Sequence, residues 1–331
     1  SIKRSSINSI SLKIAFGLHT LFYKKRILML REKFSPICFL SSLGAGGLAV
    51  SFYMYLMFMI PHKGVPMTTF DFFYPALIKQ DWFSIVCIVA AIGIIYFAFL
   101  HFKLLLWNVK QFQLYRQTPA YDSLRSSNAE VTLMSIPLTF RMTINVCFVM
   151  RALFVPHLWD VVEYLFPFAI LGFLTTGFFA LKIFIRYFSR LIVNGDFDFA
   201  SNNNLSQMIS IFAFAMVAVG LAAPGAMSHH LTINALAIFA SIFFSTISVG
   251  LLFIKLLFGL QNIFQHGISK EASPSLWIMI PILTLLGITY IRISFGLNHH
   301  FDQDLNNSSL FTFTSFVVSL QAIFGLIGYK V

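Results

Sequence analysis

The sequence predicts an all-α integral membrane protein with about eight transmembrane helices. Three observations support this prediction. Of the 331 residues, 58% are hydrophobic and 11% are charged, and the mean hydropathy is +0.80. A water-soluble domain of this length would be far more polar. In addition, the apolar residues gather in eight runs, each long enough to cross a bilayer as a helix.

The chain begins with a basic segment, residues 1–33, in which eight Lys and Arg residues alternate with Ile, Leu and Phe. This pattern is typical of an amphipathic helix that lies on the anionic cytoplasmic leaflet. The alternative is a flexible basic tail that only sets the topology. Residues 34–331 are predicted to form a single transmembrane domain.

The eight predicted spans cover residues 35–60, 82–107, 129–150, 158–188, 205–226, 231–258, 274–296 and 308–329. With the N-terminus in the cytoplasm, 18 of the 23 Lys and Arg residues lie on the cytoplasmic side, and four lie outside: Lys63, Lys79, Arg151 and Arg292. This asymmetry predicts a multi-pass protein of the cell membrane, in contact with membrane lipids, with both termini in the cytoplasm. Because the charges follow the span ends, the net charge of +11 does not indicate a nucleic-acid partner.

Two kinds of span alternate along the chain. The odd-numbered spans contain Ser, Thr, Gly and Pro, whereas the even-numbered spans are longer and consist mostly of Phe, Leu, Ile and Val. Small residues let helices approach closely, and a uniformly apolar surface suits lipid. We therefore expect repeated helical hairpins with odd helices inside and even helices outside. An ordinary bundle that uses Gly only for packing is the alternative.

The third span carries a charged residue, Arg141, near its middle. Glu130 is the carboxylate of the same span and lies too far along a helix to pair with it. A guanidinium near the bilayer centre costs at least about 2.5–3.5 kcal/mol, and such residues normally face a bundle interior or a watered cavity. We expect Arg141 to supply positive potential to a central path. A structural arginine held by carbonyls and hydroxyls is the alternative.

The predicted path runs between the odd helices, where hydroxyls and backbone groups would replace the hydration water of an ion. Its candidate lining residues are Ser41, Ser42, Gly44, Pro137, Thr139, Phe140, Arg141, Ser210, Phe212, Phe214, Pro281 and Thr284.

Other chemistry finds less support in the sequence. Catalysis would need a nucleophile with a base, or paired carboxylates, at one depth of the membrane, and the sequence shows neither. It also has no phosphate-binding loop. We therefore predict no enzyme activity and no cofactor. Imidazole clusters bind zinc or copper. An external metal site is therefore an alternative, and its candidate ligands are His229, His230, His299 and His300.

Several segments resemble one family of membrane proteins. They are FSPICFLSSLGAGGLAVSF in the first span, AEVTLMSIPLT in the third, SPSLWIMIPILTLLG in the seventh, and HFKLLLWNVKQFQLYRQTP after the second. The chain resembles the family of the tellurite-resistance protein TehA, the yeast malate transporter and the plant guard-cell slow anion channels. The resemblance implies a ring of helical hairpins around an anion path, often in a trimer, with a phenylalanine that plugs the pore.

The chain departs from that family in hairpin number, because the family has five hairpins and this sequence shows four. Either the chain is a shortened relative or its ends have been trimmed. The gate phenylalanine of the family has no counterpart here, although Phe140, Phe212 and Phe214 lie on odd spans.

We therefore predict transport of small anions, either inorganic anions or dicarboxylates, along a path between the odd helices. A non-transporting membrane subunit or sensor is the first alternative. A membrane enzyme with an external histidine metal site is the second.

Overall fold

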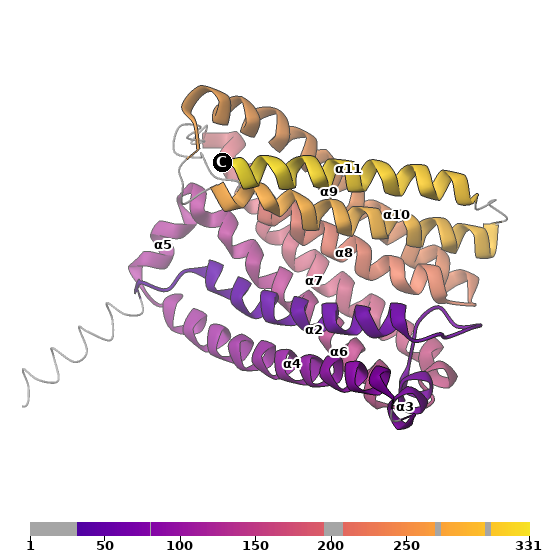
Figure 1. Cartoon of the computed structure of the whole chain (residues 1–331). Helices are drawn as coiled ribbons and strands as arrows, with labels where there is room; N and C mark the ends of the chain where they lie inside the picture. Colours follow the sequence, from indigo (N-terminus) through magenta and orange to yellow (C-terminus); the bar gives the residue numbers. More distant parts are fainter. Residues whose placement is uncertain (1–31, 80, 195–207, 269–272, 302–305) are drawn as a thin grey trace, which may run out of the picture.

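The computed structural model describes residues 32–79, 81–194, 208–268, 273–301 and 306–331 (Figure 1). The predicted amphipathic segment, residues 1–33, lies almost entirely outside these ranges. In the described residues every regular element is a helix. In chain order they are η1 (Pro36–Cys38), α2 (Phe39–Met59), α3 (Phe70–Ile78), α4 (Trp82–Tyr115), α5 (Pro119–Arg125), η2 (Asn128–Met134), α6 (Ser135–Phe154), α7 (Leu158–Asn194), α8 (Met208–Met227), α9 (Leu231–His266), η4 (Ser273–Ile278), α10 (Met279–Phe301) and α11 (Asn307–Lys330).

The prediction of eight spans is confirmed, because eight described helical segments are long and apolar enough to cross a membrane. Their bounds follow the apolar runs closely. The main differences are at helix ends. For example, α4 continues about two turns beyond the predicted end at residue 107. No Gly or Pro interrupts residues 108–115, and the chain turns where Pro119 begins α5. The short helix α3 was not predicted.

The expected difference between odd and even spans is also confirmed. In each hairpin the first helix is the more buried one. The buried share is 39% for the first span and 28% for the second, 61% for the third and 22% for the fourth, 89% for the fifth and 39% for the sixth, and 28% for the seventh and 0% for the eighth. The odd spans are therefore inner helices and the even spans are outer helices. The reason is compositional, since Phe- and Leu-rich surfaces are as stable in lipid as against protein, whereas small polar surfaces favour close helix contacts.

The inner helices lie in a row. α2 packs against α4 and α6, α6 packs against α7 and α8, and α8 packs against α9 and α10, while α11 packs against α10. In Figure 1, α4 and α2 lie along one side of the bundle, and α10 and α11 lie along the other. The most buried helix is α8, which contributes Ala213, Phe214, Val217 and Ala218 to the main hydrophobic core.

The two ends of the bundle differ in charge. One end, called here the α5 end, contains α5 and η2 and carries Arg116, Arg125, Arg186 and Arg190. The other, called here the α3 end, contains α3 and the turns after α6 and α8. Figure 1 shows the C-terminus on the side of the bundle where α5 lies.

Candidate functional site

The side chain of Arg141 lies in the interior of the bundle. Arg141 is midway along the span Asn128–Phe154 and is completely buried. Its Nη1 donates to the carbonyl oxygen of Ala213 in α8 at 2.9 Å, and its Nη2 donates to the carbonyl oxygen of Thr176 in α7 at 2.6 Å. Its Nε–H has no hydrogen-bond partner in the described part of the chain. The guanidinium is thus oriented by backbone oxygens and keeps an unused donor.

A second arginine, Arg292 of α10, also donates to the backbone of α8. Its Nη1 lies 2.8 Å from the carbonyl oxygen of Val219. Ala213 and Val219 are separated by roughly 9 Å along α8, so the two guanidinium groups bind this helix at different depths. Within the described residues neither arginine forms an ion pair. Two positive charges therefore contact the inner helix α8, and neither has a carboxylate partner among the described residues.

Arg292 was counted with the external charges, although it lies inside the predicted seventh span, residues 274–296. The seventh span was expected to end at residue 296, but α10 continues to Phe301, so Arg292 lies more than two turns before the end of the helix. The polar residues Asn298, His299 and His300 gave the impression of an earlier end. An arginine more than two turns before the helix end would have been the signal for a buried role.

Other side chains also donate to the backbone of α8. Ser248 and Ser241 of α9 donate to the carbonyl oxygens of Ile211 and Ala218 at 3.0 and 2.8 Å. Asn234 of α9 donates to the carbonyl oxygen of Gly225. Each carbonyl has two lone pairs, so these bonds add to the helical ones. The inner helix is consequently fixed from α6, α9 and α10 by polar contacts as well as by packing.

The candidate path residues of α2 and α6 fall into two groups. Ser42, Pro137 and Thr139 are buried, and Phe140 is half-buried against a small cluster around Phe39. Ser41 and Gly44 are instead exposed. Thr139 donates to the carbonyl oxygen of Phe39 at 3.1 Å, which joins α6 to α2.

The candidates on α8 and α10 also differ in what they contact. Phe214 is buried between Phe184 of α7 and Phe244 of α9, with ring centroids at 5.5 and 6.2 Å. Thr284 accepts a hydrogen bond from Gln321 of α11 at 2.6 Å. These two side chains therefore face outer helices. The remaining three are Ser210, which is buried, and Phe212 and Pro281, which are half-buried.

A buried histidine, His101 of α4, was not among the predicted site residues. Its Nδ1 lies 2.8 Å from the carbonyl oxygen of Ser42, and its Nε2 lies 2.9 Å from Oγ1 of Thr143. The ring thus joins α4 to both α2 and α6. It lies close to Gly46, where a Cβ would come within 2.8 Å of Nδ1. A lone histidine in an apolar outer span, opposite Ser- and Gly-rich segments, was the available signal.

The α5 end holds an ion-pair cluster around Glu130. This carboxylate is buried and accepts from Nε of Arg125 at 3.0 Å and from Nε of Arg190 at 3.2 Å, with Arg186 at 3.8 Å. Burial lowers the pKa of Arg125, but hydrogen bonds and charge interactions with Tyr121 and Glu130 raise it above its ordinary value overall. The cluster ties η2 to α5 and α7 and fixes the start of the span that carries Arg141.

The predicted histidine cluster at the α3 end is partly assembled. The ring of His299 lies 5.1 Å from that of His229 and 4.6 Å from that of His300, measured between centroids. However, Glu163 is already occupied, since it accepts from Oγ of Ser228 and from the backbone N–H of His229. His230 is exposed. Among the described residues, no group of three or more His, Cys, Asp or Glu side chains is arranged to hold a metal ion.

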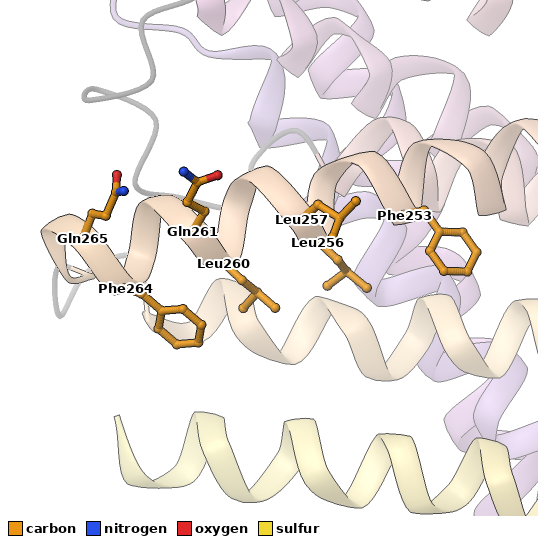
Figure 2. A pocket seen from close by; sticks show the side chains of 7 residues that line it. All are labelled: Phe253, Leu256, Leu257, Leu260, Gln261, Phe264 and Gln265. Atoms are coloured by element: carbon orange, nitrogen blue, oxygen red, sulfur yellow. The ribbon is translucent and has the colours of Figure 1, made fainter.

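A groove of about 490 Å³ lies along the last turns of α9 (Figure 2). Its lining is almost entirely apolar, and Figure 2 shows Leu256, Leu260 and Phe264 on one side of the helix and Gln261 and Gln265 on the other. None of the predicted path residues lines it. Its apolar wall is the surface expected where an outer helix meets lipid acyl chains.

Comparison of the chain with protein-family models, with curated proteins and with solved structures found no match.

Proposed function

We propose that this membrane protein transports small anions. One observation carries the proposal: the guanidinium of Arg141 is buried midway along the apolar span Asn128–Phe154, its Nε–H has no described partner, and no described carboxylate pairs with it. Intramembrane charges are costly and mark ion or substrate pathways in membrane proteins. A positive charge in a narrow site of low dielectric attracts anions strongly.

The second arginine supports the same proposal. Arg292 donates to α8 about 9 Å from the level at which Arg141 donates. An anion that moves between inner helices would therefore meet two positive charges in succession. Conduction needs sites that bind an ion weakly enough to release it, and two staggered charges meet this requirement better than one deep site.

The identity of the anion is proposed from the resemblance of the sequence. The segments that resemble the tellurite-resistance and malate transporter family suggest inorganic anions or dicarboxylates as substrates. On the same ground the protein would form homo-oligomers, with a trimer as the first expectation. The excess of Lys and Arg at the α5 end suggests that this end, with both termini, faces the cytoplasm.

A second candidate function is that of a non-transporting membrane subunit. The observation that favours it is that Arg141 and Arg292 both bond to backbone carbonyls of α8. Such bonds also occur where an arginine only holds helices together. In that case the charges would matter for folding and not for ions.

Anion flux into liposomes that contain the pure protein tests the proposal. Chloride, nitrate, succinate and tellurite would be offered separately, and flux would be divided by the amount of monodisperse protein. Arg141→Glu reverses the charge at the site and should abolish anion flux or admit cations. The matched control is Arg151→Glu, because Arg151 lies on the same helix with an exposed side chain at the α3 end.

The two candidate functions predict different results. Loss of anion flux in Arg141→Glu, with normal flux in Arg151→Glu, supports transport. If none of the four anions moves, or if Arg141→Glu keeps the parental anion selectivity per folded molecule, anion transport through this site is wrong. Loss of monodisperse protein in Arg141→Glu, with parental flux from the folded remainder, indicates the structural role.

A further inference from the structure

The hydrogen bonds around His101 suit both protonation states of its ring. When Nδ1 carries the proton, it donates to the carbonyl oxygen of Ser42 at 2.8 Å, and Nε2 accepts the hydroxyl proton of Thr143 at 2.9 Å. When both nitrogens are protonated, Nε2 donates to the same hydroxyl oxygen. The hydroxyl of Thr143 can then donate to the carbonyl oxygen of Thr139 at 3.2 Å. Only one hydroxyl rotation separates the two complete sets of bonds.

A stripe of hydroxyl groups leads from this ring toward the α5 end. Thr132, Ser135, Thr139 and Thr143 are spaced by three or four residues and therefore share one helix face. Each donates to the carbonyl oxygen three or four residues earlier, at 2.7 to 3.2 Å. The first three are buried and the last is half-buried. The stripe provides polar groups along a route of roughly 16–20 Å between His101 and the end of the bundle.

No described charged group forms a hydrogen bond or an ion pair with the imidazole ring. The ring packs against α2 and α6 besides its own helix α4. The titratable and charged residues of these helices are Tyr53 and Tyr55 on α2; Arg141, Cys147 and Arg151 on α6; and Cys87, Tyr96, Lys103, Lys110 and Tyr115 on α4. Tyr53 donates to Thr68 near the α3 end, and Arg141 donates to α7 and α8. Protonation of His101 therefore adds an uncompensated positive charge to the interior.

We propose that His101 is a proton-binding site and that proton binding at this residue is coupled to anion movement. The coupling rests on the proposed function. A proton on His101 adds positive charge next to α6, the helix that carries Arg141, and so favours an anion in the bundle. The anion lowers the electrostatic penalty of the second positive charge in return, so each ligand favours the other. The proton binds to the lone pair of Nε2 and leaves from the same nitrogen.

Proton-linked flux in liposomes tests the coupling. The vesicles would contain a trapped pH dye, with chloride or succinate as the probe anion and the membrane potential clamped. His101→Gln keeps a donor and an acceptor but cannot bind a proton in this pH range. His230→Gln is the control, because His230 is exposed at the α3 end.

In the parent and in His230→Gln, anion entry should acidify the vesicle interior. On the alkaline side of the profile, flux should fall about tenfold per pH unit, in proportion to the protonated fraction. His101→Gln should transport without acidification and should vary less than about twofold per pH unit. Parental acidification and a parental pH profile in His101→Gln would overturn the proposal.

Two further measurements keep the result clear. Nitrogen NMR of labelled histidines, taken as the difference between parent and His101→Gln, reports proton binding without any transport. If the parent moves no anion, the proposed function fails and the coupling with it. The NMR still decides on the proton site, which is refuted if the ring keeps one protonation state between about pH 4 and pH 9. If His101→Gln does not fold, Thr143→Val must change the midpoint of the pH profile, and an unchanged midpoint refutes the proposal.

Discussion

Replacement of Arg141 by methionine should leave the protein folded and reduce its anion flux. Methionine has a similar length and adapts to irregular spaces, so it can fill most of the volume of the guanidinium side chain. The substitution removes the positive charge and the two hydrogen bonds to Ala213 and Thr176. It leaves both carbonyl oxygens within helices, where they keep their helical bonds.

The expected change in stability is small because large terms oppose each other. Each hydrogen bond from a charged donor contributes about 1.5–3 kcal/mol, so the two bonds together contribute about 3–6 kcal/mol. Against this, removal of an intramembrane charge gains about 2.5–3.5 kcal/mol. Removal of the unpartnered Nε–H gains about 1–3 kcal/mol more. The free energy of unfolding should therefore change by less than about 2 kcal/mol, as with other buried charges replaced by apolar groups of similar volume.

Alanine at the same position should behave differently. It removes the same interactions but also leaves a cavity, since Arg141 is among the largest fully buried side chains. Large-to-alanine changes in a packed interior cost about 2–5 kcal/mol. The pair of variants thus separates the effect of charge from the effect of volume.

Unfolding in mixed micelles and flux per monodisperse protein would be measured on the same samples. If an anion in the path gains about 1.4 kcal/mol from Arg141, Arg141→Met should lower the flux about tenfold. Arg141→Lys should retain part of the flux, because it keeps the charge but loses the planar set of donors. The reasoning is refuted if Arg141→Met loses more than about 4 kcal/mol of stability while the folded fraction transports normally.

Three further outcomes are expected. Glu130→Gln should destabilise the α5 end by about 2–4 kcal/mol, because it leaves the partly buried Arg125 and Arg190 without their carboxylate. Hydrogen exchange should then rise in η2 and α5 before it rises elsewhere, and a uniform rise along the chain would contradict the stabilising role of this cluster. Asp81 caps α4 by accepting from the backbone N–H of Ser84 at 2.9 Å, which lowers its pKa. The stability that this cap contributes is present above the ordinary pKa of aspartate and is lost as pH falls through the lowered pKa. The melting temperature of the parent should therefore fall more in acid than that of Asp81→Asn. If the two proteins show the same dependence of melting temperature on pH, the cap does not contribute to stability. A tag at either terminus should be reached only from the cytoplasmic side, and labelling of the C-terminus on intact cells would show that the topology is wrong.

Composition alone was enough to predict the architecture. In a bilayer every backbone N–H and C=O must be satisfied within the chain, so eight apolar runs have few options other than eight helices. The contrast between small polar and Phe-rich spans then predicted which helices are inner, because only the first kind gains from close helix contacts. Helix ends were less predictable. The seventh span was ended at the first polar residues, whereas α10 continues through them to Phe301.

The sequence by itself thus determined the number of spans, their order and their division into inner and outer helices. It also identified Arg141 as a charge without a local partner. The tertiary structure decided where the side chains point, because the rotation of a helix about its axis depends on all its neighbours. It turned Thr284 toward Gln321 of an outer helix and joined His101 to two inner helices. It also gave Arg141 backbone oxygens of Ala213 and Thr176 as partners, and these have no sequence signal because every residue has a carbonyl group.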